Sequence, residues 1–149
     1  MMIIARPVLV LSVAVALFLT TTTAFAQKAT TPATGSKERK ALMDALRVPF
    51  EKQLGKPVIF VVTWLKVSGN FAMWEGEPKR TGGKPIDWKK TKFKEDYEQG
   101  LIDAISMALL KKTGGKWKVV EYAIGPTDYP VEYWREKHKA PKAIFRVPG

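Results

Sequence analysis

The side chains most often used in catalysis and metal binding are scarce in this sequence. Its 149 residues include one histidine, His138, and no cysteine. A transition-metal site needs several imidazoles, thiolates or converging carboxylates, and a serine or threonine nucleophile needs a base within reach. His138 lies between two lysines at the expected end of a helix, where we expect a solvated surface residue. The sequence excludes thiol catalysis and disulfides, and it predicts neither a metal site nor a cofactor.

Carboxylates are the remaining candidates for acid–base chemistry. The positions considered are Asp103, Glu121, Asp128 and the neighbouring pair at 95–96. Asp128 is the most interesting, because it follows a Gly-Pro bend and precedes a group of aromatic residues. Capping of the next helix through backbone N–H groups is nevertheless a sufficient role for Asp128. We therefore assign no catalytic residue.

Lysine is the abundant functional group, and much of it is concentrated between residues 79 and 94. The stretch KRTGGKPIDWKKTKFK has a single acid, Asp87. Trp88 and Phe93 lie among the lysines, so a ring could stack on a ligand while cations hold its phosphates or sulfates. Alternatively, the stretch is a solvated loop whose Trp88 packs back onto the core. The candidate binding residues in it are Lys79, Arg80, Lys84, Trp88, Lys89, Lys90 and Lys92.

A second group of lysines surrounds an expected turn. Two strand-like runs meet at Gly114-Gly115, which is typical of a β-hairpin. Residues 97–108 are ambiguous between helix and strand, and we predict a strand over 104–112. Four lysines would then crowd around the hairpin tip, and they complete the candidate binding set: Lys111, Lys112, Lys116 and Lys118.

The N-terminus predicts export. Arg6 precedes an apolar run from Val8 to Leu19, and Ala24-Phe25-Ala26 places small residues at the two positions that signal peptidase reads. A retained membrane anchor is the alternative, but the run is shorter than the ~20 residues of a membrane span. Removing residues 1–26 takes away one cation and no acid, so the formal net charge falls from +11 to +10.

An exported protein with this charge meets anionic partners such as lipid headgroups, cell-wall polymers or lipopolysaccharide. Alternatively, the positive net charge only keeps the protein soluble. Export argues against nucleic acid as a biological partner, although the charge alone would permit binding to it.

A run of β-branched and aromatic residues, VIFVVTWLKV at 58–67, predicts the central strand of the fold. Both of its alternating sets are apolar, as in a strand that is covered on both faces. Ser36 can cap a preceding helix. We expect Pro49 to produce a kink or a fresh short turn up to Leu54, and Gly55 to end the helix.

The rest of the chain supplies a second hairpin strand and a terminal helix. A turn at 68–70 leads into a strand that we expect to fray or become an edge near Gly76 and Pro78. Pro130 fits the first turn of a helix that ends near His138. The apolar residues in the last segment predict that the tail docks on the sheet.

These patterns predict an α+β fold, in which an N-terminal helix packs on a four-stranded antiparallel meander sheet and a short helix follows at the C-terminus. We expect a secretory signal peptide over 1–26, a disordered tether over 27–35 and a single domain over 36–149.

The arrangement resembles the cystatin-like and nuclear-transport-factor-2-like architectures. GKWKV at 115–119 resembles the G-x-W-x-V strand of the latter, although its several N-terminal helices around a pocket are missing. The sequences at 42–47, 60–74 and 109–128 together are similar to a group of small exported bacterial proteins without an assigned activity. The resemblance implies the fold and export, and it implies no reaction.

Two functions from different classes follow. The first is a noncatalytic binding protein that uses the two lysine groups to contact an anionic envelope polymer or an acidic protein. The second is a small-ligand pocket protein, or an enzyme, with a cavity between helix and sheet lined by Trp64, Trp74, Trp117 and Tyr122. We prefer the first, because such aromatic residues are more often core than ligand contacts.

Overall fold

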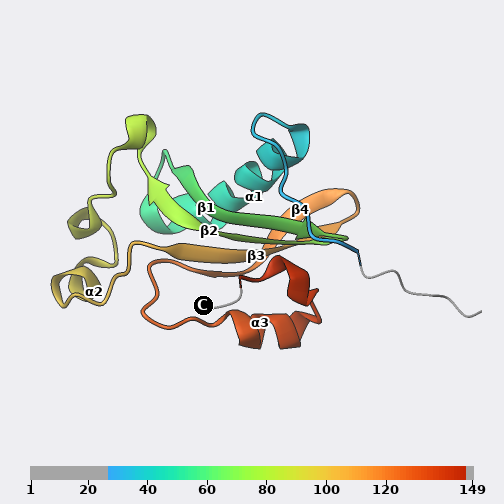
Figure 1. Ribbon diagram of the computed structural model, residues 1–149. Helices are drawn as coiled ribbons and strands as arrows, with labels where there is room; N and C mark the ends of the chain where they lie inside the picture. Colours follow the sequence, from blue (N-terminus) through green and yellow to red (C-terminus); the bar gives the residue numbers. More distant parts are fainter. Residues whose placement is uncertain (1–26, 147–149) are drawn as a thin grey trace, which may run out of the picture.

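A four-stranded antiparallel meander forms the centre of the protein. The computed structural model describes residues 27–146; residues 1–26 and 147–149 lie outside it, and with them the expected signal peptide. The strands pair in the order β1-β2-β3-β4, which confirms the predicted α+β class (Figure 1). In chain order the elements are α1 (Lys37–Leu54), β1 (Ile59–Ser68), β2 (Phe71–Lys79), η1 (Thr81–Gly83), η2 (Trp88–Lys90), α2 (Lys94–Glu98), β3 (Ser106–Thr113), β4 (Lys116–Ala123), α3 (Val131–His138) and η3 (Lys142–Ile144).

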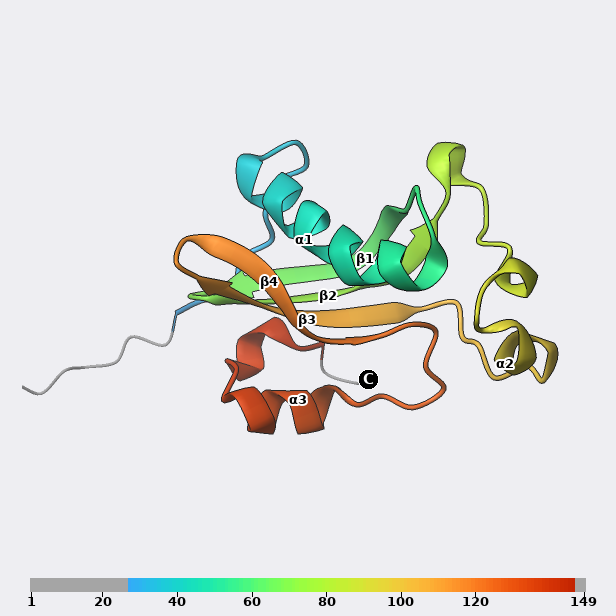
Figure 2. The ribbon, with the colours of Figure 1, turned by 180° about the vertical axis from the view of Figure 1, so that it is seen from behind.

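The sheet is covered on both faces. Helix α1 lies on one face, and α3 with the C-terminal segment lies on the other, as the two opposite views in Figures 1 and 2 show. Ile144 and Phe145 are buried, so the predicted docking of the tail is confirmed. No helix within residues 27–146 combines the length and apolarity that a membrane crossing requires.

Helix α1 begins and ends where the sequence predicts. The Ser36 hydroxyl accepts a hydrogen bond from the Arg39 N–H at 3.1 Å, and Gly55 follows the last turn with a positive φ of 80°. A fresh turn at Pro49 is not formed, because α1 continues through Pro49 to Leu54 as one helix. Proline removes only the hydrogen bond to the Ala45 carbonyl, and the buried side chains on both sides of it hold the helix on the sheet. These are Leu42, Leu46, Phe50 and Leu54.

Strand β1 is an edge strand, so its expected central position is wrong. It pairs with β2 alone among the strands, and its first half is only partly buried. The most buried strands are β2 and β3. An apolar run of this length indicates a strand covered on two faces, but it carries no information on strand order. Beyond Gly76, β2 pairs with β1 only, which confirms the edge expected near Pro78.

Gly76 is required by the close approach of β1. A Cβ atom built at this position would lie 1.9 Å from the Val61 carbonyl oxygen and 3.0 Å from the Trp74 ring. The register of β1 on β2 shifts between Val62 and Trp64, so the strand is irregular just where glycine lets the backbones meet.

The ambiguous segment at 97–108 contains the end of a short helix, α2, and the start of strand β3. Helix α2 ends at Glu98, and β3 begins at Ser106, so the predicted strand is confirmed. Gly114 and Gly115 have φ values of 58° and 74°, the positive pair that a two-residue hairpin turn of type I′ requires.

Residues 27–35 differ from the disordered tether that the sequence predicts. Thr30 and Val67 exchange two backbone hydrogen bonds of 2.8 Å each. The Ser68 hydroxyl also donates to the Gln27 carbonyl, at 2.8 Å. The segment therefore lies along the free edge of β1 and satisfies backbone groups that would otherwise be exposed there.

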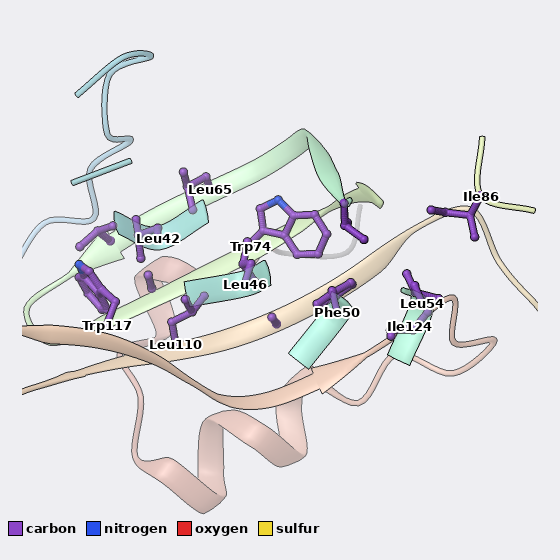
Figure 3. Packing of buried hydrophobic residues seen from close by; sticks show 14 residues of the cluster. Leu42, Leu46, Phe50, Leu54, Leu65, Trp74, Ile86, Leu110, Trp117 and Ile124 are labelled. Atoms are coloured by element: carbon purple, nitrogen blue, oxygen red, sulfur yellow. The ribbon is translucent and has the colours of Figure 1, made fainter. Parts of the chain in front are cut away.

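Alternation along the central strands divides the core into two clusters. Ala72 and Trp74 of β2 pack under α1, while Met73 packs against α3 and the C-terminal segment. Figure 3 shows the larger cluster, where the side chains of α1 point down onto Trp74, Leu110 and Trp117.

Candidate functional site

A groove of about 620 Å³ lies between α1 and β4. The helix contributes Ala45, Val48, Pro49, Lys52 and Gln53 to its lining, and the strand contributes residues 116–120 and Tyr122. Ligand pockets have volumes of roughly 300–1,000 Å³, so this α1–β4 groove is large enough for a ligand. Its apolar surface is open to solvent, because the Val48 side chain is 73% exposed.

The sequence predicts four aromatic residues in the lining of a helix–sheet cavity, and two of them line this groove. Trp117 and Tyr122 line it, and Gln53 Nε2 donates to the Tyr122 hydroxyl at 3.0 Å, which joins helix and strand at one end. Trp74 is fully buried in the core, and Trp64 points to the other face, where its Nε1 donates to the Ile144 carbonyl at 2.7 Å. Local sequence cannot distinguish an aromatic residue that lines the groove from one in the core or on the other face, because all four lie in strands.

Four lysines gather beside the groove, at the tip of the β3–β4 hairpin. Lys111 and Lys118 are directly opposite each other in the ladder, and Lys112 and Lys116 flank them. Within residues 27–146, none of the four has a carboxylate within 4.0 Å. The Lys112 ammonium lies 5.4 Å from the centre of the Trp117 ring, within the range of a cation–π contact. We call these four residues the lysine tip.

The predicted binding stretch at 79–94 lies at the other end of the sheet from the lysine tip (Figures 1 and 2). Several of its groups are engaged in structure. Arg80 Nη2 donates to the Leu54 carbonyl at 2.6 Å, and Nη1 donates to the carbonyls of Gly55 and Pro57 at 2.6 and 3.0 Å. The guanidinium thus supplies donors to the C-terminal end of α1.

Neighbouring groups in the same stretch have local partners. The Lys79 ammonium lies 2.5 Å from Glu77, and the Lys90 ammonium lies 3.4 Å from Asp87. The backbones of Lys84 and Arg80 are bridged. Trp88 packs against the core and meets Phe93 edge to face, with ring centres 6.1 Å apart. Trp88 therefore packs back onto the core, as the alternative interpretation of this stretch as a solvated loop predicts. The exposed cations of this stretch include Lys84, Lys89, Lys90 and Lys92.

A buried carboxylate that sequence reasoning missed lies on the other face of the sheet. Glu75 of β2 is 2% exposed, and its Oε1 accepts a hydrogen bond from the Tyr129 hydroxyl. Arg146 Nη1 lies 3.9 Å from Glu75 Oε2. Burial raises the pKa of Tyr129 above its ordinary value, and the neighbouring Glu75 carboxylate raises it further. The available signal was the position of this acid directly after the apolar run at 71–74, on the same side of the strand as Met73.

Two of the acids considered from sequence share a hollow with Glu75. Asp103 and Asp128 line the same space of about 270 Å³. The expected cap by Asp128 is wrong, because Pro130 occupies the N-cap of α3 and no side chain caps the helix. Asp103 accepts the Ile105 N–H at 2.9 Å, which is a turn contact. Among residues 27–146, no three His, Asp or Glu side chains are placed to share a metal ion.

His138 is half-buried, which corrects its expected position as a solvated surface residue. Its Nε2 lies 2.8 Å from Glu121 Oε1, and the Lys137 ammonium lies 2.6 Å from the same oxygen. Burial opposes ionisation of Glu121, but hydrogen bonds from Lys137 and His138 outweigh it and lower the pKa of this carboxyl. The cluster fastens α3 to β4.

Comparison with known proteins gives no match, whether to family models, to curated proteins or to solved structures. The resemblance to cystatin-like and nuclear-transport-factor-2-like architectures therefore stays a prediction. Functional inference for this chain depends on the geometry of its own residues.

Proposed function

We propose that this chain is a noncatalytic exported binding protein, which holds an anionic envelope polymer or an acidic protein at the lysine tip and the adjoining α1–β4 groove. The observation that carries the proposal is the cross-strand pair of Lys111 and Lys118 in the lysine tip, two like charges directly opposite each other with no carboxylate within 4.0 Å of either in the described part of the chain. Like charges directly opposite each other in a ladder are destabilising. An anionic partner removes that repulsion.

The groove adds apolar contact area beside the charge. Trp117 and Val119 form part of its lining, and Lys52 of α1 joins Lys116 and Lys118 around them. Opposite charge accelerates encounter and orients the partner, whereas apolar and aromatic contacts slow its release. The combination supports retention of a ligand without any chemical step.

Retention on immobilised dextran sulfate, a model anionic polymer, tests the proposal. Binding should weaken strongly as salt rises, because exposed charges are screened. The double variant Lys116→Gln/Lys118→Gln should bind about 3- to 30-fold more weakly, since each exposed pair contributes about 0.3–1 kcal/mol. The matched control Lys89→Gln/Lys92→Gln removes the same charge from the other end of the sheet and should change binding less. Equal losses in both variants, or binding that salt does not affect, would contradict the proposal.

A small-molecule ligand in the same groove is the second candidate. It is favoured by the volume of about 620 Å³ and by the aromatic residues Trp117 and Tyr122 in the lining. Titration with 8-anilinonaphthalene-1-sulfonate, an anionic aromatic probe, should then saturate at one site and be lost on Trp117→Ala. A normally folded variant that still binds the probe would exclude this candidate.

A further inference from the structure

Strand β4 has a free edge that borders the groove. It pairs with β3 alone among the strands within residues 27–146. The groove lining includes consecutive residues of β4 from Lys116 to Val120 and then Tyr122. Seven strand residues extend over roughly 20 Å. The groove therefore runs beside a length of strand backbone that could pair with another extended chain.

Backbone hydrogen-bonding groups are available on the strand wall and on the helix wall. An edge strand presents a row of unpaired N–H and C=O groups. On the helix, Pro49 has no N–H to donate to the Ala45 carbonyl, and both residues line the groove. Such groups match a polypeptide, which carries donors and acceptors at regular spacing, better than a lipid tail or a sulfated polymer.

Charge determines which polypeptide suits this edge. Lys116 and Lys118 of β4 and Lys52 of α1 are the charged residues of the groove lining. Trp117 and Val119 pack in the cluster under α1, so Lys116 and Lys118, which alternate with them, lie on the opposite face of β4. A second copy of this chain would bring its own lysines against them, and edge lysines disfavour such self-pairing. An acidic strand would instead place carboxylates next to these ammonium groups.

We infer that the occupant of the groove is an extended acidic segment of a partner protein, which adds to β4 as a fifth strand. Its apolar side chains, at alternate positions, lie over Trp117 and Val119 and against Val48. Its acidic side chains, on the opposite face of the added strand, meet Lys116 and Lys118. The inference builds on the proposed function, because it names the class of anionic partner and adds backbone pairing to charge attraction.

A pair of synthetic peptides separates strand addition from charge attraction alone. The first alternates glutamate and valine over about ten residues, with blocked ends. The second has the same sequence but N-methylated amides at every second residue along one edge, which removes backbone donors and keeps every charge. Calorimetric titration should give saturable binding of the first peptide and at least about tenfold weaker binding of the second, because main-chain hydrogen bonds supply much of the affinity in strand addition.

Two protein variants locate the site. Val48→Glu puts an acid into the groove lining at a position 73% exposed, and glutamate is a better helix former than valine. This variant should lose at least about tenfold in affinity for the first peptide, because it puts a carboxylate against the valines of the peptide and repels its glutamates. The matched control is Leu101→Glu, an exposed apolar position outside the groove lining, and it should bind the peptide as the natural chain does.

The outcomes distinguish this inference from the proposed function. Equal affinity for both peptides, or equal losses in both variants, overturns strand addition and leaves charge-based binding in place. Binding to dextran sulfate or to anionic phosphatidylglycerol vesicles, without binding to the first peptide, also overturns it. Absence of binding to all of these probes overturns both proposals.

Discussion

Lys111 of β3 and Lys118 of β4 are directly opposite each other in the ladder, with no carboxylate within 4.0 Å of either in the described part of the chain. An arrangement of two exposed like charges lowers the stability of the hairpin that carries it. The proposed anionic partner would supply the countercharge that this pair lacks.

Reversing one of the two charges should raise stability and weaken binding. Lys118→Glu replaces repulsion with attraction toward Lys111, so the free energy of unfolding should rise by about 0.2–1 kcal/mol. Urea denaturation at low and high salt measures this gain, which should shrink with salt. Lys116→Glu is the control on the same strand, because its ladder partner is the uncharged Thr113. A gain of equal size in both variants would mean that general charge reduction, and not the cross-strand pair, is responsible.

Removing the Tyr129 hydroxyl should destabilise the fold through Glu75. Tyr129→Phe leaves a buried carboxylate oxygen without its donor, which should cost about 1–3 kcal/mol. Tyr133→Phe, at a position 64% exposed, should change stability little. Chemical denaturation of both variants at neutral pH makes the comparison. Equal small effects would show that the hydrogen bond contributes nothing to stability.

The contact between Tyr129 and Glu75 also predicts that the stability of the fold decreases at alkaline pH. The folded-state pKa of Tyr129 lies above its ordinary value of 10.0, because burial and the Glu75 carboxylate both disfavour the phenolate. In the unfolded chain the phenol ionises at that ordinary value. The contribution of Tyr129 to stability is therefore constant below about pH 10 and is lost as the pH rises above it. The natural chain should lose stability faster than Tyr129→Phe in this range, and parallel slopes would contradict the assignment.

Arg80 should matter more for stability than for ligand binding. Arg80→Ala removes donors from the carbonyls of Leu54, Gly55 and Pro57, and we expect a loss of about 1–3 kcal/mol. Arg80→Lys should restore only part of it, since an ammonium group cannot reproduce the planar fork of the guanidinium. Lys84→Ala is the control, because Lys84 contacts Arg80 through its backbone. Thermal unfolding measures all three, and full rescue by lysine would show that charge alone suffices.

Local patterns in the sequence were sufficient for the elements and for the α+β class. Apolar side chains at three- and four-residue spacing predict α1, Ser36 and Gly55 mark its ends, and the Gly114-Gly115 pair predicts the hairpin that brings the lysine tip together. Each of these features depends on interactions between residues close in the chain. Such interactions can be recognised without knowledge of the rest of the fold.

Tertiary structure alone decided which strand is at the edge and which residues meet across the sheet. β1 is apolar on both faces and yet lies at an edge, with Thr30 paired to Val67. The contact between Glu75 and Tyr129 joins residues 54 positions apart, and the α1–β4 groove forms where α1, on one face of the sheet, packs over the edge strand β4. These relationships follow from how whole faces pack together, since side-chain periodicity specifies which face is buried but not the element that covers it.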